Sequence, residues 1–472
     1  MMVKSWLQRQ MPLLSGPAAF VLGYVICAPQ LGAKGAAAMG MALWMALWWV
    51  LRPVDIAVTS MLPIVINSLF DLIPASHVIS QYFSEIVVLL LGADLLCLTW
   101  HTTGLDRRIS VRVLCHIGAS MRAQVFAWLM VSVVLSVFLP NVVVAAILCP
   151  IAVAMLDFLG GGTTDRRMAM PILLAIGWGS GIGGFGSPIG GSANLVAISY
   201  LENLLGHEFM YVDWVVRFLP ILAIVAALNL VFLWHYTPDV HAHGSRAYFR
   251  KSYASFGAMK RGERIGLWLF VLAAVLVFLR PLYADVLPGL KPAYSFLLCG
   301  FLLFFLHDEK GAPMLTWKYA EHNIMWGMMF LFASGMALGR VMIETGAVDA
   351  LAKMLASWNL DGGFGTVLAF VVFASCMSEV SSNTAAVSIA MPIVISICTA
   401  LGLDAASYIL IVIVAANCAY VLPVSTRAIP VGFGLEAGTQ IRLGLRLTVL
   451  NMLVTTAVGC ACLRFVPWFG QL

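Results

Sequence analysis

The sequence predicts an all-α polytopic membrane protein. Hydrophobic residues make up 61% of the 472-residue chain, whereas charged residues make up only 10%. A soluble domain of this size would be about one-quarter charged. The hydrophobic residues also form long uncharged runs, and about 18 such residues are enough for a helix to span a bilayer. These observations exclude a soluble globular domain.

The charge pattern indicates a membrane orientation rather than a nucleic-acid partner. The net charge of +5 is modest and gathers in short loops, and basic loops of membrane proteins usually face the cytoplasm. Lys4 and Arg9 precede the first apolar segment, so we expect a cytoplasmic N-terminus. We also expect no cleaved signal peptide, and a location in the plasma membrane, specifically a bacterial inner membrane. The ten cysteines lack the spacing of a metal site or a disulfide framework.

Four helices are expected first. They cover residues 12–26, 37–51, 56–72 and 86–103, so the first domain (residues 1–80) holds three of them. Residues 123–156 are uncharged but are interrupted by Leu139-Pro140-Asn141. Broken backbone at membrane depth needs a protein-lined cavity. The interruption therefore predicts a re-entrant helical hairpin over residues 122–157.

A glycine-rich run follows over residues 168–201. Gly179, Gly181 and Gly184 match a dinucleotide-binding fingerprint formally, but no predicted strand precedes them. A helix that unwinds midway explains these glycines better, because glycine lets backbone approach a solute closely. This broken helix and a helix over 214–236 complete a first repeat, residues 81–238.

The second half shows the same order of elements. A basic cytoplasmic loop is expected over 239–264, and helices over 265–282 and 293–306 lie within residues 265–320. The second repeat, 321–472, contains a helix over 324–343, a hairpin over 363–403, a broken helix over 405–437 and a helix over 443–466. Its centre is Ser382-Asn383-Thr384, at the start of an uncharged run. These polar side chains need hydrogen-bond partners or a bound ion in such surroundings, and their oxygen atoms would suit Na⁺ as ligands.

An internal repeat relates the halves. Asn141 and Asn383 are 242 positions apart, and so are Ser136 and Ser378, Pro150 and Pro392, and Thr103 and Thr345. Five full helices are expected between the hairpins, so the second hairpin should enter from the opposite face. Two such hairpins, each followed by a broken helix, are typical of a secondary transporter with inverted repeats.

Several motifs resemble those of the divalent anion/sodium symporter (DASS) family, within the ion transporter superfamily. They are Leu47-Trp48-Trp49, the segments 59–65, 182–190 and 418–426, and Ser382-Asn383-Thr384-Ala385-Ala386 with Pro392. The resemblance covers about residues 36–470. It implies about 11 transmembrane helices plus two hairpins, scaffold and transport domains, a homodimer, and an elevator-like movement. It also implies dicarboxylate, tricarboxylate or sulfate substrates and no enzymatic activity.

The resemblance also implies the site residues. The implied substrate-binding residues are Asn141, Val142, Gly191, Ser192, Ser382, Asn383, Thr384, Thr426 and Arg427. The implied Na⁺ ligands are Ser136, Asn141, Gly190, Ser378, Ser382, Asn383 and Ser425. The first half departs from the family because Pro140 and Val142 replace a motif serine and threonine. This loss puts the first Na⁺ site in doubt.

These departures leave alternatives open. Arg427 stands where the family has proline, and it could bind a carboxylate, replace a lost Na⁺, snorkel toward cytoplasmic water or pair with an acid. The acids in the expected membrane segments are Asp94 and Glu379. A Na⁺-independent anion exchanger is therefore an alternative to a Na⁺-coupled dicarboxylate transporter. A cation/proton antiporter or arsenite-type efflux protein is a further one, in which Asp94 would be essential.

Overall fold

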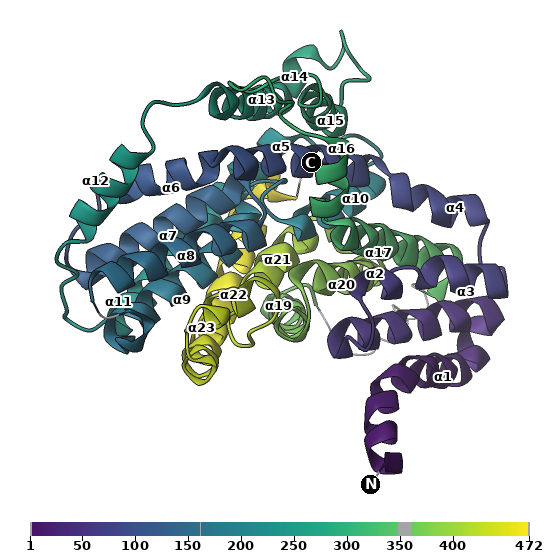
Figure 1. Cartoon of the computed structure of the whole chain (residues 1–472). Coiled ribbons are helices and arrows are strands. Elements are labelled where there is room, and N and C mark those ends of the chain that lie inside the picture. Colours follow the sequence, from purple (N-terminus) through teal and green to yellow (C-terminus); the bar gives the residue numbers. More distant parts are fainter. Residues whose placement is uncertain (1, 161, 348–360, 471–472) are drawn as a thin grey trace.

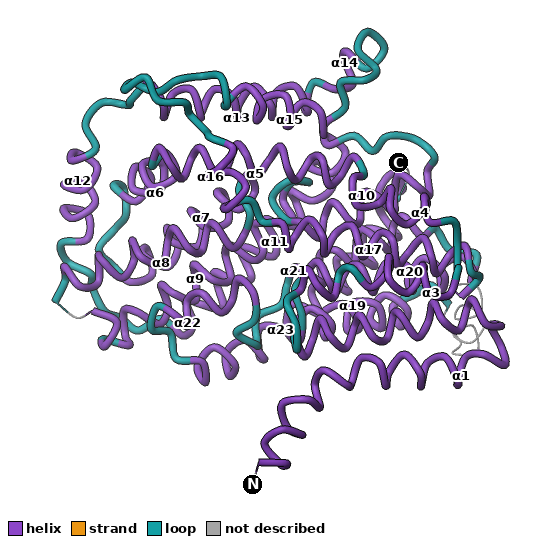
Figure 2. Tube along the Cα trace, turned by 45° about the vertical axis from the view of Figure 1, so that its right-hand side comes forward, coloured by secondary structure: helices purple, strands orange, loops and turns teal. Residues whose placement is uncertain are grey.

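The structure is a computed structural model that describes residues 2–160, 162–347 and 361–470. Within these ranges the chain folds into helices, turns and loops without a β-sheet (Figures 1 and 2). Nine described helical segments are long and apolar enough to cross a membrane, and four shorter apolar helices accompany them. The predicted all-α membrane fold is confirmed. The predicted number of 11 spanning helices stays a prediction.

The N-terminal helices differ in detail from the predicted ones. Helix α1 (Met2–Leu51) joins the first two predicted segments and is interrupted at Gly32 (φ 68°, ψ 179°). The apolar helix predicted over 56–72 forms as two short helices in succession, α2 (Ile56–Thr59) and α3 (Leu62–Phe70). Pro63 lies in the first turn of α3, where its missing N–H is tolerated. The short helices α4 (Ala75–Ile79) and η1 (Ser80–Phe83) lead to α5 (Glu85–Thr103).

The first helical hairpin forms where the sequence predicts it. Helices α7 (Met121–Phe138) and α8 (Asn141–Phe158) are separated by Leu139 and Pro140. Leu139 is extended (φ −120°, ψ 150°), as expected for a residue that precedes proline. The predicted broken helix follows as α9 (Arg166–Gly183), the irregular segment with η3 (Gly184–Gly186), and α10 (Ser192–Leu205). Helix α11 (Tyr211–Tyr236) completes this half.

The second half repeats this arrangement. Its hairpin comprises α19 (Phe364–Val380) and α20 (Asn383–Leu401). Its broken helix comprises α21 (Ala405–Asn417), η5 (Ser425–Arg427) and α22 (Ala428–Gly432). Helix α23 (Ala437–Phe465) begins earlier than the predicted residue 443, because its polar first turns are helical as well. Residues 348–360 of the predicted second repeat lie outside the described residues.

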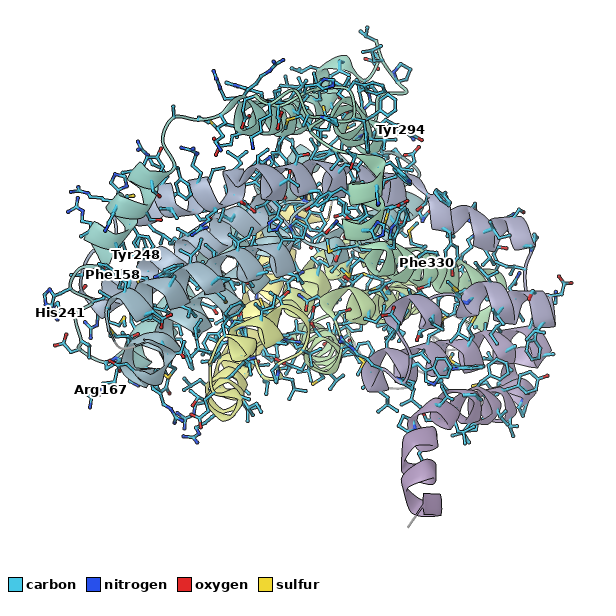
Figure 3. The ribbon with its side chains drawn as sticks, viewed as in Figure 1. Phe158, Arg167, His241, Tyr248, Tyr294 and Phe330 are labelled. Carbon is cyan, nitrogen blue, oxygen red and sulfur yellow. The ribbon has the colours of Figure 1, made fainter. Side chains whose placement is uncertain are left out.

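The remaining helices lie before the two hairpins or between the two halves. They are α6 (Leu105–Leu114), α12 (Ser245–Ser255), α13 (Arg261–Phe278), α14 (Arg280–Tyr283), α15 (Pro292–Leu302), α16 (Trp317–Asn323) and α17 (Trp326–Glu344). The predicted basic loop over 239–264 therefore contains a helix, α12. Tyr248 of α12 packs on Phe158 at the base of the first hairpin, with ring centroids 5.1 Å apart (Figure 3).

The two hairpins lie beside each other across the centre of the molecule. Helices α7 and α8 occupy the left of Figures 1 and 2, and α19 and α20 lie to their right. Helix α5 runs above them, covered by α13 and α15. The helices before the two hairpin segments end alike, because Gly104 and Gly346, 242 positions apart, both have positive φ (76° and 72°). This similarity agrees with the repeat offset found in the sequence.

Close packing of α9 on α7 depends on glycine. A Cβ atom on Gly183 would lie 2.8 Å from both Ser136 Cβ and Val133 Cα, and closer still to the Val133 carbonyl oxygen. Small residues permit such close helix contact in membrane proteins. The glycine-rich run therefore holds the broken helix against the first hairpin.

We expect Gly183→Ala to lower the thermal stability of the detergent-solubilised protein. The added methyl would force α9 from α7, and overpacking of this kind costs about 1–3 kcal/mol. Gly438→Ala is the matched control, because a Cβ there would meet nothing within 4 Å. Equal unfolding midpoints for both variants would contradict this account of the packing.

Candidate functional site

A cavity of about 100 Å³ lies where the two hairpin tips and the two broken helices meet. All nine residues predicted to bind substrate line this cavity. They are Asn141, Val142, Gly191, Ser192, Ser382, Asn383, Thr384, Thr426 and Arg427. Asn141 and Asn383, from opposite halves of the chain, therefore share one pocket.

The seven predicted Na⁺ ligands divide into two groups. Asn141, Gly190, Ser382, Asn383 and Ser425 line the cavity. Ser136 and Ser378 are fully buried and lie outside its lining. Their hydroxyl groups instead contact the two tip asparagines. These two serines orient the asparagine side chains that reach the cavity.

At the first tip, Ser136 Oγ lies 3.0 Å from Asn141 Oδ1 and 2.8 Å from the carbonyl oxygen of Ser180. The amide Nδ2 of Asn141 donates to the carbonyl oxygen of Gly181, 3.3 Å away. Ser180 and Gly181 belong to the end of α9. These contacts bind the hairpin tip to the point where the broken helix unwinds.

The second tip makes similar contacts, except that its asparagine donates to a side chain instead of a backbone carbonyl. Ser378 Oγ lies 2.8 Å from Asn383 Oδ1 and 2.5 Å from the carbonyl oxygen of Ala416. Asn383 Nδ2 donates to Asn417 Oδ1 at 3.3 Å. Ala416 and Asn417 end α21 as Ser180 and Gly181 end α9. The two tips therefore make similar hydrogen bonds.

Polar contacts also join the two halves. The hydroxyl oxygens of Ser192 and Thr384 are 2.7 Å apart. Asn417 Nδ2 donates to Asn194 Oδ1 at 3.4 Å, and Asn194 Nδ2 donates to the carbonyl oxygen of Gly184 at 2.7 Å. The sequence-based prediction missed Asn417, although it is an amide in an otherwise apolar segment.

Another wall of the cavity comes from α5 and the start of α17. It contains Leu90, Ala93, Asp94, Cys97, Met325, Met328 and Met329. Periodicity alone could not single out the methionines, because core and cavity positions look alike on a buried helix. Asp94 is the acidic residue of this wall, and its Oδ2 accepts a hydrogen bond from the backbone N–H of Met325 at 3.2 Å.

Comparisons with known proteins identify the architecture. Residues 8–468 match the protein family described as "Sodium:sulfate symporter transmembrane region". The chain belongs to this family. It is 28% identical over 439 residues to the sodium-dependent dicarboxylate transporter SdcS of Staphylococcus aureus, covering 89% of this chain and 84% of the relative. The corresponding SdcS of Staphylococcus saprophyticus is 27% identical over 442 residues, with the same coverage.

A solved structure has a similar fold. The YdaH transporter of Alcanivorax borkumensis matches with a TM-score of 0.52 and 15% identity, covering 82% of this chain and 87% of that one. This likeness concerns the fold alone. Together, the family match and the apolar helices establish a multi-pass membrane protein of a transporter family.

Compared with the family motif, Arg427 is the principal departure at the second broken helix. Arg427 is 5% exposed and forms an ion pair with Glu379, with 2.9 Å between Nη1 and Oε2. Its Nη2 donates to the carbonyl oxygen of Ser378 at 2.8 Å, and its Nε to that of Val424 at 3.3 Å. Of the alternatives for Arg427, the pairing with an acid is the one observed. Direct substrate binding by Arg427 stays a prediction.

Glu379 fastens the irregular segment after α21. Its carboxylate accepts backbone N–H groups from Tyr420 (2.6 Å), Val421 (2.9 Å) and Leu422 (3.2 Å). The hydroxyl of Thr448 on α23 donates to it at 2.9 Å. Glu379 thus accepts hydrogen bonds from backbone N–H groups that have no partner within a helix.

We expect Glu379→Ala to destabilise the protein far more than Arg427→Ala. Removing the carboxylate leaves a buried cation uncompensated, which costs about 3–5 kcal/mol. Removing the guanidinium leaves Glu379 with its backbone and hydroxyl donors, so the loss should be about 1–3 kcal/mol. Thermal unfolding midpoints would measure both.

Glu321→Ala is the control, because Glu321 is exposed on α16, and it should change stability by less than about 0.5 kcal/mol. An Arg427→Ala variant that is less stable than Glu379→Ala would refute the assigned roles.

Proposed function

We propose that the protein is a Na⁺-coupled secondary transporter of small divalent organic anions, dicarboxylates such as succinate, malate and fumarate. The observation that carries this proposal is the convergence of three helix N-termini on one cavity. Helices α8, α10 and α20 begin at Asn141, Ser192 and Asn383, and all three residues line the cavity. Helix N-termini present free N–H groups and partial positive charge, which favour anions.

The cavity also offers hydroxyl donors for carboxylate groups. Ser192, Ser382, Thr384 and Thr426 come from both halves of the chain. A dicarboxylate has two anionic ends, so a site with donors on both sides suits it. The relative SdcS is a sodium-dependent dicarboxylate transporter, which supports this substrate class.

Na⁺ is the proposed coupling ion. Moving each negative charge against an inside-negative potential costs about 2.3 kcal/mol per 100 mV, so a dianion needs a compensating cation. The tip of the second hairpin supplies amide and hydroxyl oxygens from Asn383 and Ser382 together with backbone carbonyl groups, and hard cations prefer such ligands. The first tip has fewer hydroxyl groups because Pro140 and Val142 flank Asn141.

The larger arrangement is part of the proposal. We infer a homodimer in a bacterial inner membrane, with a cytoplasmic N-terminus and a transport domain that moves past a scaffold like an elevator. The hairpins and broken helices would form the transport domain. The helices of residues 1–80 and 265–320 would belong largely to the scaffold.

The alternatives receive less support from the site. A Na⁺-independent exchanger would use Arg427 as the substrate's cation, yet this guanidinium is hydrogen-bonded to Glu379 and to backbone carbonyl groups. A cation/proton antiporter would not need three helix N-termini at its site. The geometry therefore favours an anion as the transported solute.

We expect purified protein in proteoliposomes to take up labelled succinate when an inward Na⁺ gradient is present, and much less when choline replaces Na⁺. Asn383→Ala should lower Na⁺-driven uptake at least about tenfold, because one lost ligand or hydrogen bond to a charged group is worth about 1.5–3 kcal/mol. Asn323→Ala is the matched control, since Asn323 is exposed on α16.

Absence of uptake of any dicarboxylate, citrate or sulfate would overturn the proposed function. Equal uptake in Na⁺ and choline would retain an anion transporter but reject Na⁺ coupling.

A further inference from the structure

Among the described residues the acidic side chains of Asp94, Asp106, Glu263 and Glu379 are buried. The surroundings of Glu379 and Asp94 differ sharply. Glu379 accepts hydrogen bonds from three backbone N–H groups, Thr448 and Arg427. Asp94 is 7% exposed and accepts one hydrogen bond, from the backbone N–H of Met325 at 3.2 Å. Among the described residues, no cationic side chain forms an ion pair with Asp94. A buried carboxylate with so few partners is costly unless something neutralises it.

The position of Asp94 makes this charge relevant to transport. It lies midway along α5 and lines the cavity that also contains the two hairpin tips. An ionised carboxylate there would repel an incoming dianion. A protonated carboxyl group is neutral and has an O–H that can donate to the anion. The protonation state of Asp94 therefore affects the affinity of the cavity for the anion.

We propose that Asp94 is a proton-binding site whose occupation is linked to binding of the anion, which rests on the proposed function. A proton from water joins the carboxylate as the dicarboxylate enters, and returns to water when the anion leaves. One positive charge thus accompanies each bound dianion, in addition to any Na⁺ at the hairpin tips. Asp94 is not part of the family motifs that predict the Na⁺ ligands.

The surrounding wall favours a proton over a metal cation. The neighbours of Asp94 in the cavity lining on α5 and at the start of α17 are Leu90, Ala93, Cys97, Met325, Met328 and Met329. Their side chains are apolar or carry sulfur. A hard cation such as Na⁺ prefers several oxygen ligands, which these side chains do not provide. A proton needs only the carboxylate.

Other titratable groups around α5 lie towards its ends or across the cavity. Cys97 is one turn along the same helix, and Arg427 lines the cavity but is paired with Glu379. The helices packed on α5 carry further groups. The groups near the N-terminus of α5 are Tyr82, Tyr200, Glu202 and Lys291. The groups near its C-terminus are Asp106, Arg107, Arg108, Arg112, Arg261, Glu263 and Arg264. Further groups are Tyr294 and Cys299 on α15, Lys318, Tyr319, Glu321 and His322 on α16, and Arg340 and Glu344 on α17. None of these forms a hydrogen bond or ion pair with Asp94 among the described residues.

The direct test measures protons taken up on binding. Fumarate is added to purified wild-type protein in weakly buffered detergent solution near neutral pH, with a pH indicator present. We expect the solution to become more alkaline as fumarate binds, because binding draws protons to Asp94. Asp94→Asn, which resembles the neutral form, should bind fumarate without this change. The control Asp239→Asn, in an exposed loop, should behave like the wild type.

Transport provides the second measurement. Fumarate suits this test because it stays a dianion from about pH 6 to about pH 8, so a change of KM in this range comes from the protein. The KM of the wild type should rise with pH as Asp94 ionises. The KM of Asp94→Asn should stay nearly constant, and that of Asp239→Asn should follow the wild type.

The outcomes separate the inference from the proposed function. Fumarate binding to the wild type without proton uptake would overturn the inference even if Asp94→Asn does not fold. A wild-type pH profile retained in Asp94→Asn would also overturn it. Loss of Na⁺ dependence in Asp94→Asn with the pH profile intact would show a Na⁺ site instead. Failure of fumarate, succinate and malate to bind to or move through the wild type at any pH would refute the proposed function itself.

Discussion

The centre of this molecule contains backbone N–H and carbonyl groups that have no hydrogen bond within a helix, and its structure depends on providing partners for them in an apolar interior. No water is available in a bilayer core to pair with a free N–H or carbonyl group, so the protein must supply the partners. At each hairpin tip a serine and an asparagine five positions later meet the backbone at the end of a broken helix. The irregular backbone is therefore held in place by the residues that form the cavity.

The two halves solve this problem with different chemistry. In the second half the charged carboxylate of Glu379 gathers three backbone N–H groups and is balanced by Arg427. The equivalent position of the first half, 242 residues earlier, is Val137. There the amide of Asn194 donates to the carbonyl oxygens of Gly184 and Ser187. The halves share a backbone plan and differ in polarity, and the second tip is richer in oxygen ligands.

The sequence predicted the features that depend on local pattern. Pro140 and the polar tip at Asn383 interrupt uncharged runs, so the hairpins and their breaks could be found from the chain alone. The constant offset between the two halves then led to the prediction that Asn141 and Asn383 share one cavity. Patterns do not show which side chains meet across space, and so they left the partner of Arg427 open. They also missed the methionines at the start of α17 and the contact of Asn417 with Asn194, and they placed a loop where the short helix α12 forms.

The contacts between the two halves limit how the protein can rearrange. Ser192 touches Thr384, and Asn417 touches Asn194, so the second tip and the two broken helices are bonded to each other. The first tip is bonded to α9. Pulling them apart would leave several buried polar groups without partners. The wall formed by α5 and the start of α17 meets this unit mostly through apolar and sulfur-containing side chains, whose contacts are not directional and can be exchanged during sliding. In the proposed elevator-like movement, the tips and broken helices would therefore move together past that wall.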